Sequence, residues 1–139
     1  MSLLDASALP RMLRVRQGFP QSTPLEIPDS VAEQISLLQD RLTPGTRVAL
    51  TVGSRGIANI KEIVFAVLGE LKAAGVEPFI VPAMGSHGGA TPEGQKRILA
   101  DYGITEQTMG VPIEAAMETR EIGRTQNGIP AFTSSAVLS

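Results

Sequence analysis

Residues 76–94 read VEPFIVPAMGSHGGATPEG and join an apolar run, a glycine-rich loop and a helix start in direct succession. The run at 76–81 (VEPFIV) has the length and apolar character of a strand buried on both faces. The TPE sequence at 91–93 then supplies an N-cap, a first-turn proline and a first-turn acid in the order that helices prefer. We therefore predict a strand, a loop and a helix that runs to Tyr102.

The same succession occurs once earlier in the chain. Residues 47–52 (RVALTV) form a short, nearly continuous apolar run, and the loop at 53–58 (GSRGIA) follows it. Asn59 with Glu62 three positions later has the pattern of a capping box, and Gly75 can end the helix in a left-handed turn. The apolar positions between them have helical spacing: Ile60, Ile63, Val64, Val67, Leu68 and Leu71.

Two successive strand–loop–helix units are typical of α/β proteins. We expect an open, Rossmann-like three-layer sheet of mainly parallel strands with right-handed crossovers, and we treat residues 1–139 as a single α/β domain. Near the end of the chain, the segments 118–123 and 129–132 flank the turn sequence QNG at 126–128. Asn-Gly between apolar runs predicts a C-terminal β-hairpin.

The N-terminal part has weaker signals. Residues 12–17 (MLRVRQ) alternate apolar and basic side chains, which predicts an edge or half-exposed strand. An extended surface segment is expected next, because proline lacks the backbone donor of a sheet ladder and this segment contains Pro20, Pro24 and Pro28. Asp29 or Ser30 is then expected to cap a helix that ends before residue 44.

Composition excludes several classes of protein. The chain of 139 residues is 42% hydrophobic and has 12 basic against 14 acidic residues, which is typical of a globular domain. A net charge of −2 without a basic cluster argues against nucleic-acid binding. There is no cysteine, no signal-peptide pattern and no apolar run of about 20 residues, so we expect no membrane association and a cytoplasmic location.

Both glycine-rich loops follow predicted parallel strands. Ligands of open α/β sheets bind at the carboxyl ends of the strands, so Arg55 and His87 are expected to face one ligand. His87 is the only histidine and can exchange a proton near neutral pH, while the guanidinium of Arg55 can bind a carboxylate or phosphate in a bidentate manner. The glycines permit close approach of a ligand, and the free amides at the following helix start favour an anion.

Simpler interpretations remain open at this point. His87 could bond a backbone carbonyl, and Arg55 could form a structural pair with Glu62 or Glu93. Neither loop has the G-x-G-x-x-G pattern or the G-K-[ST] sequence of a P-loop, and the scattered carboxylates lack the spacing of a metal site, so we expect no metal site within this chain.

Four segments, VGSRGIANI, VPAMGSHGGAT, YGIT and METREIG, together resemble the N-terminal domain of the nickel-dependent lactate racemase family over roughly residues 11–132. The resemblance implies a longer protein of two α/β domains with the active site in the cleft between them. It also implies a nickel-pincer nucleotide, anchored by a lysine and a nickel-ligating histidine of the second domain. We expect that C-terminal domain to be a partner absent from this chain, which ends without a stop signal.

The resemblance also implies roles for individual residues. His87 matches the histidine of the family's Gly-Thr-His motif, an acid/base group beside the substrate α-carbon. Arg55 matches the arginine of the Asp-x-Thr-Arg motif that holds the substrate carboxylate, Ser54 replaces its threonine, and Val52 stands where the motif has aspartate. The cofactor- or anion-binding loop would comprise Gly53, Gly85, Ser86, Gly88 and Gly89.

The expected function is a racemase or epimerase of 2-hydroxy acids that acts by hydride transfer through a 2-keto acid, with this chain alone inactive. Val52 leaves the substrate open between lactate, another 2-hydroxy acid and a sugar acid. The alternative is a non-catalytic module that binds an anion or small ligand. An apolar cleft surface left uncovered by the missing domain leads to the hypothesis that the isolated chain forms homo-oligomers.

Overall fold

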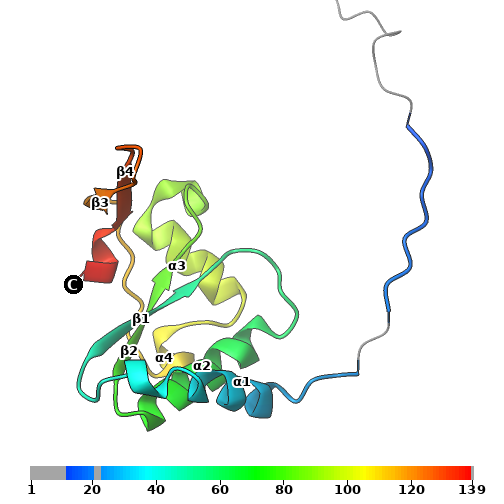
Figure 1. The fold of residues 1–139 in the computed structure, drawn as a ribbon, viewed down its shortest axis with the longest axis horizontal. Helices are drawn as coiled ribbons and strands as arrows, with labels where there is room; N and C mark the ends of the chain where they lie inside the picture. Colours follow the sequence, from blue (N-terminus) through cyan, green and yellow to red (C-terminus); the bar gives the residue numbers. More distant parts are fainter. Residues whose placement is uncertain (1–11, 21–22, 139) are drawn as a thin grey trace, which may run out of the picture.

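A computed structural model describes residues 12–20 and 23–138 (Figure 1). The elements are α1 (Ile27–Ser36), β1 (Arg47–Val52), α2 (Ile60–Ala73), β2 (Glu77–Pro82), α3 (Pro92–Asp101), α4 (Glu106–Met109), β3 (Thr119–Arg124) and β4 (Pro130–Ser134). Helices and strands alternate as far as α3, which is followed by α4 and the C-terminal hairpin, and short 3₁₀ turns lie between some elements. The 3₁₀ turns are η2 (Gln39–Arg41), η3 (Gly88–Ala90) and η4 (Ser135–Leu138).

The described part of the chain has a mixed α/β fold with a small parallel sheet. β1 pairs with β2 in parallel, from Arg47 opposite Glu77 to Val52 opposite Pro82. On the other side of β2, Ile80 makes an isolated parallel bridge with Ile113. Its amide donates to the carbonyl of residue 112 at 2.9 Å, and its carbonyl accepts from the amide of residue 114 at 2.8 Å. The α/β class and parallel pairing are confirmed, and among the described residues this sheet has two strands.

The two faces of the parallel sheet are covered differently. Helices α2 and α3 pack on one face, where Leu68, Ile80 and Leu99 are at most 1% exposed. Each such side chain contributes roughly 1.5–3 kcal/mol by leaving water. On the opposite face, Phe79 and Val81 pack against Ala136 of the C-terminal turn η4 rather than against a helix. The described residues therefore bury the second face with a short turn where a three-layer sheet would have helices.

Local signals in the two strand–loop–helix units are mostly confirmed. Gly75 ends the α2 region with φ +80°, and a Cβ there would lie 3.3 Å from Pro44 Cβ. The Thr91 hydroxyl caps α3 by accepting from the Gly94 amide at 3.0 Å. The predicted capping box of α2 is wrong, because Asn59 has φ 60° and its side chain makes no cap hydrogen bond. The left-handed backbone of Asn59, which asparagine tolerates well, begins this helix.

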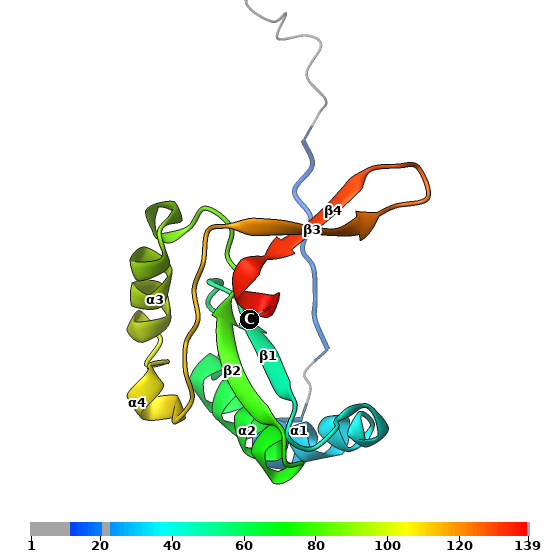
Figure 2. The same cartoon turned by 90° about the vertical axis from the view of Figure 1, so that its left-hand side faces the viewer.

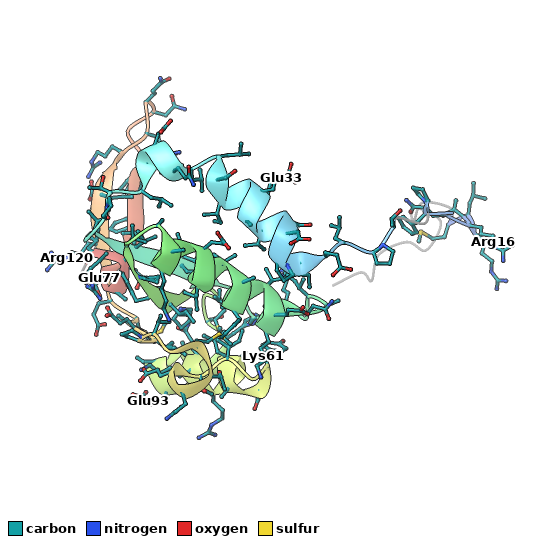
Figure 3. The ribbon with its side chains drawn as sticks, turned by 90° about the horizontal axis from the view of Figure 1, so that it is seen from below. Arg16, Glu33, Lys61, Glu77, Glu93 and Arg120 are labelled. Atoms are coloured by element: carbon teal, nitrogen blue, oxygen red, sulfur yellow. The ribbon has the colours of Figure 1, made fainter. Side chains whose placement is uncertain are left out.

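Predictions for the N-terminal part are corrected by the structure. Residues 12–17 are exposed and belong to no strand, and Figure 3 places Arg16 on this extended segment away from the helices. α1 begins at Ile27, before the proline expected to precede it, and neither Asp29 nor Ser30 caps it. Proline needs no amide partner in the first helical turn, so Pro28 starts this helix instead of preventing it.

The predicted C-terminal hairpin is confirmed. β3 and β4 pair antiparallel with a bulge between Glu121 and Gly123, and Gly128 in the turn has φ +77°. Figure 2 shows the hairpin extending beyond the parallel sheet, with η4 returning to that sheet. None of the described helices has the length and apolar character that crossing a bilayer requires.

Candidate functional site

The two glycine-rich loops leave the parallel sheet side by side. Val52 and Pro82 are opposite each other at the ends of β1 and β2, and the amide of Ala83 donates to the carbonyl of Val52 at 2.8 Å. The loops at 53–59 and 83–91 therefore start from neighbouring positions on one edge of the sheet. This is the arrangement that the sequence predicts for strands paired in parallel.

A hydrogen bond joins the two loops through their side chains. Ser54 Oγ lies 2.6 Å from His87 Nδ1. The imidazole therefore bonds a hydroxyl on the neighbouring loop rather than a backbone carbonyl, which answers the first of the simpler interpretations. With Nδ1 occupied, Nε2 is the ring nitrogen left to exchange a proton with a ligand.

Helix α3 holds both loops in place. The Tyr102 hydroxyl donates to the carbonyl of Ser54 at 2.8 Å, and Gln95 Nε2 donates to the carbonyl of Gly85 at 2.7 Å. Gln95 is 4% exposed, so its bond to Gly85 is shielded from water. Sequence reasoning missed both residues, because neither contact follows from a short pattern: Tyr102 is 48 positions from Ser54, and Gln95 is 10 positions from Gly85. The only available signal was that Tyr102 is the sole tyrosine.

Arg55 is exposed beside this Ser54–His87 pair. Within residues 12–20 and 23–138 its guanidinium forms neither an ion pair nor a hydrogen bond, so the structural pair with Glu62 or Glu93 is not formed. Its donors can therefore bind an external anion without breaking an internal contact.

The two loops enclose a cavity of about 570 Å³, which we call the His87 cavity. Its size lies within the range of about 300–1,000 Å³ that is usual for small-ligand sites. The polar side chains at its wall include a guanidinium, two hydroxyls and an imidazole. The lining residues are Gly53, Ser54, Arg55, Ile57, Ala83, Met84, Gly85, Ser86 and His87.

The glycines of the second loop have two different roles. Gly85 and Gly89 have φ +57° and +68°, and a Cβ on either would meet no atom within 4 Å, so they leave open space beside the loop. Gly88 and Gly94 instead let two backbone segments touch, since a Cβ on Gly88 would lie 2.6 Å from the amide nitrogen of Gln95. Gly88 and Gly89 shape the loop without lining the His87 cavity.

Val52 belongs to the core rather than to the His87 cavity. It is 3% exposed and packs in the apolar cluster that contains Leu68 and Ile80. An aspartate at this position, as in the Asp-x-Thr-Arg motif, would place a carboxylate against apolar side chains. Valine at this position therefore suits the packing beneath the first loop.

The titratable group whose pKa is clearly shifted lies outside the cavity. The backbone amide of Ile113 donates to Glu106 Oε1 at 3.2 Å, and Lys96 Nζ lies 3.3 Å from the same oxygen. Both interactions favour the carboxylate and lower the pKa of Glu106, with the backbone hydrogen bond as the larger cause. Across the described ranges, no group of three or more His, Cys, Asp or Glu side chains could hold a metal ion.

Comparisons with known proteins leave the family open. No protein-family model matches the chain, and neither a curated protein nor a solved structure is significantly similar to it. The residues of the site themselves offer a guanidinium that can bind an anion, an imidazole that can exchange a proton, and a hydroxyl hydrogen-bonded to that imidazole.

Proposed function

We propose that this chain is the N-terminal catalytic domain of a racemase or epimerase that interconverts the stereoisomers of a 2-hydroxy acid. The observation that carries the proposal is the Ser54–His87 hydrogen bond beside an Arg55 guanidinium without an ion-pair partner among the described residues. A 2-hydroxy acid presents a carboxylate and a hydroxyl on adjacent carbons. The His87 cavity offers one complementary group for each.

Each side chain has a distinct task in this proposal. Arg55 binds the substrate carboxylate through two parallel hydrogen bonds, which also orients the α-carbon. His87 takes the proton of the substrate hydroxyl at Nε2 and later returns it, a contribution of about 10²–10⁴-fold in rate for a group of this kind. Ser54 is a positioning residue, because its bond to Nδ1 keeps the ring oriented with Nε2 toward the ligand.

The cofactor expected from the resemblance is consistent with the donor set of the cavity. The imidazole of this cavity is already hydrogen-bonded to Ser54. A nickel-pincer nucleotide would therefore be anchored by a second domain, and these two loops would lie next to it without holding it. When bound, that cofactor would accept and return the hydride of the substrate α-carbon. The open space beside Gly85, which lines the cavity, leaves room for a flat group against the loop.

The second domain is part of the same proposal. We propose that the chain continues into a C-terminal α/β domain, that the parallel sheet is extended into a three-layer Rossmann-like arrangement, and that the protein is cytoplasmic. The exposure of His87 and Arg55 supports a partner surface, because catalysis of this kind needs water excluded from the reacting groups.

The test is racemisation of a panel of 2-hydroxy acids by the full-length, nickel-loaded protein. His87→Ala should lower turnover by about 10²–10⁴-fold. Arg55→Ala should mainly raise KM, while Arg97→Ala, an exposed arginine on α3, serves as the matched control. Wild-type turnover retained in His87→Ala would refute the assigned acid/base role.

A second candidate function is a non-catalytic module that holds an anion between the two loops. The exposure of Arg55 on an open glycine-rich surface favours it. Calorimetric binding of lactate and oxalate that depends on Arg55, together with no turnover by the loaded full-length protein, would select this module over the racemase.

A further inference from the structure

A second cavity adjoins the His87 cavity on the side of the hairpin. It has a volume of about 360 Å³ and lies between the end of the parallel sheet and β4; we call it the hairpin cavity. The two cavities share Ala83, Met84 and Gly85 as lining residues, so both lie against the start of the second loop. The remaining lining residues are Thr51, Val81, Pro82, Gln95, Ala116, Met117, Thr119, Phe132, Thr133, Ser134 and Val137.

The chemistry of the hairpin cavity contrasts with that of its neighbour. None of the lining side chains carries a charge, whereas the His87 cavity contains a guanidinium. A charged group placed in the hairpin cavity would gain no opposite charge from its lining residues, whereas a carboxylate in the His87 cavity would gain one from Arg55. The lining residues therefore offer no charged partner to a second carboxylate, an ammonium or a phosphate.

Hydrogen-bonding groups remain available in the wall. In the described part of the chain, the hydroxyls of Thr51, Thr119 and Thr133 have no hydrogen-bond partner, whereas Ser134 already bonds the carbonyl of Ala116. Hydroxyls can donate and accept, so they suit ligand groups of the same kind.

Gln95 adds an amide oxygen to this wall. Its Nε2 is used by the carbonyl of Gly85, and its Oε1 has no hydrogen-bond partner among the described residues. The described residues include no fully buried side-chain oxygen that lacks a partner, so Oε1 retains some exposure, and Gln95 lines the hairpin cavity. An acceptor on a side chain that is 4% exposed is well placed to bind a ligand hydroxyl.

We propose that the hairpin cavity is a substrate subsite for an uncharged, hydroxyl-bearing tail. This inference rests on the proposed function and makes its substrate class specific: 2-hydroxy acids with a polyhydroxylated chain, rather than short or dicarboxylic ones. The carboxylate binds Arg55, the reacting hydroxyl faces His87, and the tail passes Gly85 into the hairpin cavity. Apolar contacts with the carbon chain come from side chains such as Phe132.

The experiment is calorimetric binding of four acids to the full-length protein, whose second domain closes the site in the proposed function. Lactate has no tail, gluconate has a hydroxylated tail, malate has a charged tail and 2-hydroxyhexanoate has an apolar tail. Gluconate should bind most tightly of the four. Thr133→Val should weaken gluconate binding by roughly 2- to 12-fold, as expected for one hydrogen bond, and leave lactate binding unchanged.

Three further variants complete the design. Thr43→Val is the matched control, since this threonine is exposed and lines neither cavity. Thr51→Val replaces Thr133→Val if circular dichroism shows that the latter does not fold. Arg55→Ala should weaken the binding of all four acids, because each presents the same carboxylate.

The outcomes separate the two proposals. One outcome would overturn the subsite and leave the proposed function standing. In it, lactate and gluconate bind equally tightly, Arg55→Ala weakens both, and the threonine variants do not change the affinity for gluconate. Tighter binding of malate or 2-hydroxyhexanoate than of gluconate would also overturn the subsite. If Arg55→Ala leaves the affinity for all four acids unchanged, or if none of the acids binds, both the proposed function and the subsite are overturned.

Discussion

Gly94→Ala should destabilise the protein even though it replaces glycine by the best helix former. Gly94 lies in the first turn of α3, and an added Cβ would lie 2.7 Å from the Gly88 carbonyl carbon and 2.8 Å from Thr91 Oγ1. Its closest approach is to the carbonyl oxygen of Gly88, which already accepts from the Thr91 hydroxyl at 3.0 Å. Backbone atoms cannot rotate away, so the loop that carries His87 has to move.

The magnitude follows from two opposing effects. Alanine in a helix is favoured over glycine by about 1 kcal/mol. Overpacking typically costs about 1–3 kcal/mol, and contacts this short against backbone fall at the upper end. We expect the free energy of unfolding to fall by about 2 kcal/mol.

Urea unfolding followed by circular dichroism measures this change. Gly69→Ala is the matched control, because Gly69 lies in α2 and a Cβ there would meet no atom within 4 Å. This control should raise the free energy of unfolding by up to about 1 kcal/mol. A Gly94→Ala protein as stable as the wild type would refute the reasoning, because the loop and helix could then separate without cost.

Two further predictions concern the packing of Val52 in the core and the ionisation of Glu106. Val52→Asp should lower the free energy of unfolding by several kcal/mol, since it buries a carboxylate in an apolar cluster, and a urea midpoint near that of the wild type would contradict this. An NMR titration should give Glu106 a pKa below its ordinary value, because the amide of Ile113 and a nearby ammonium favour the carboxylate. Since this pKa is lowered by folding, the stabilisation is present above the unfolded pKa and is lost as pH falls through the folded pKa; Glu106→Gln should remove that part of the pH dependence.

Elements with local signals were predictable from the sequence. The capping by Thr91, the left-handed Gly75 and the Asn127–Gly128 turn each depend on residues only a few positions apart. Local contacts of this kind favour the same backbone geometry in many folds, so a short pattern is enough to predict it. The predicted strand at 12–17 failed for the complementary reason, because a strand exists only when another segment pairs with it.

In the candidate site, too, the features set by local signals were predictable and those set by long-range contacts were not. Sequence patterns were enough to place His87 and Arg55 on loops after two strands, because strand and loop signals are local. The bond between Ser54 and His87 joins residues 33 positions apart and requires the register that puts Val52 opposite Pro82. Register is decided by how whole elements pack, which no short pattern encodes.

The same physical reason explains the contacts that sequence reasoning missed. Tyr102 reaches the carbonyl of Ser54 across 48 positions, and Gln95 reaches Gly85 only because α3 lies against the second loop. Short-range patterns along the chain predicted most helices and turns and identified the reactive residue types. Which of those residues meet, and which cavities they enclose, depended on long-range packing of the apolar faces, because burial favours many pairings and only the assembled core selects one.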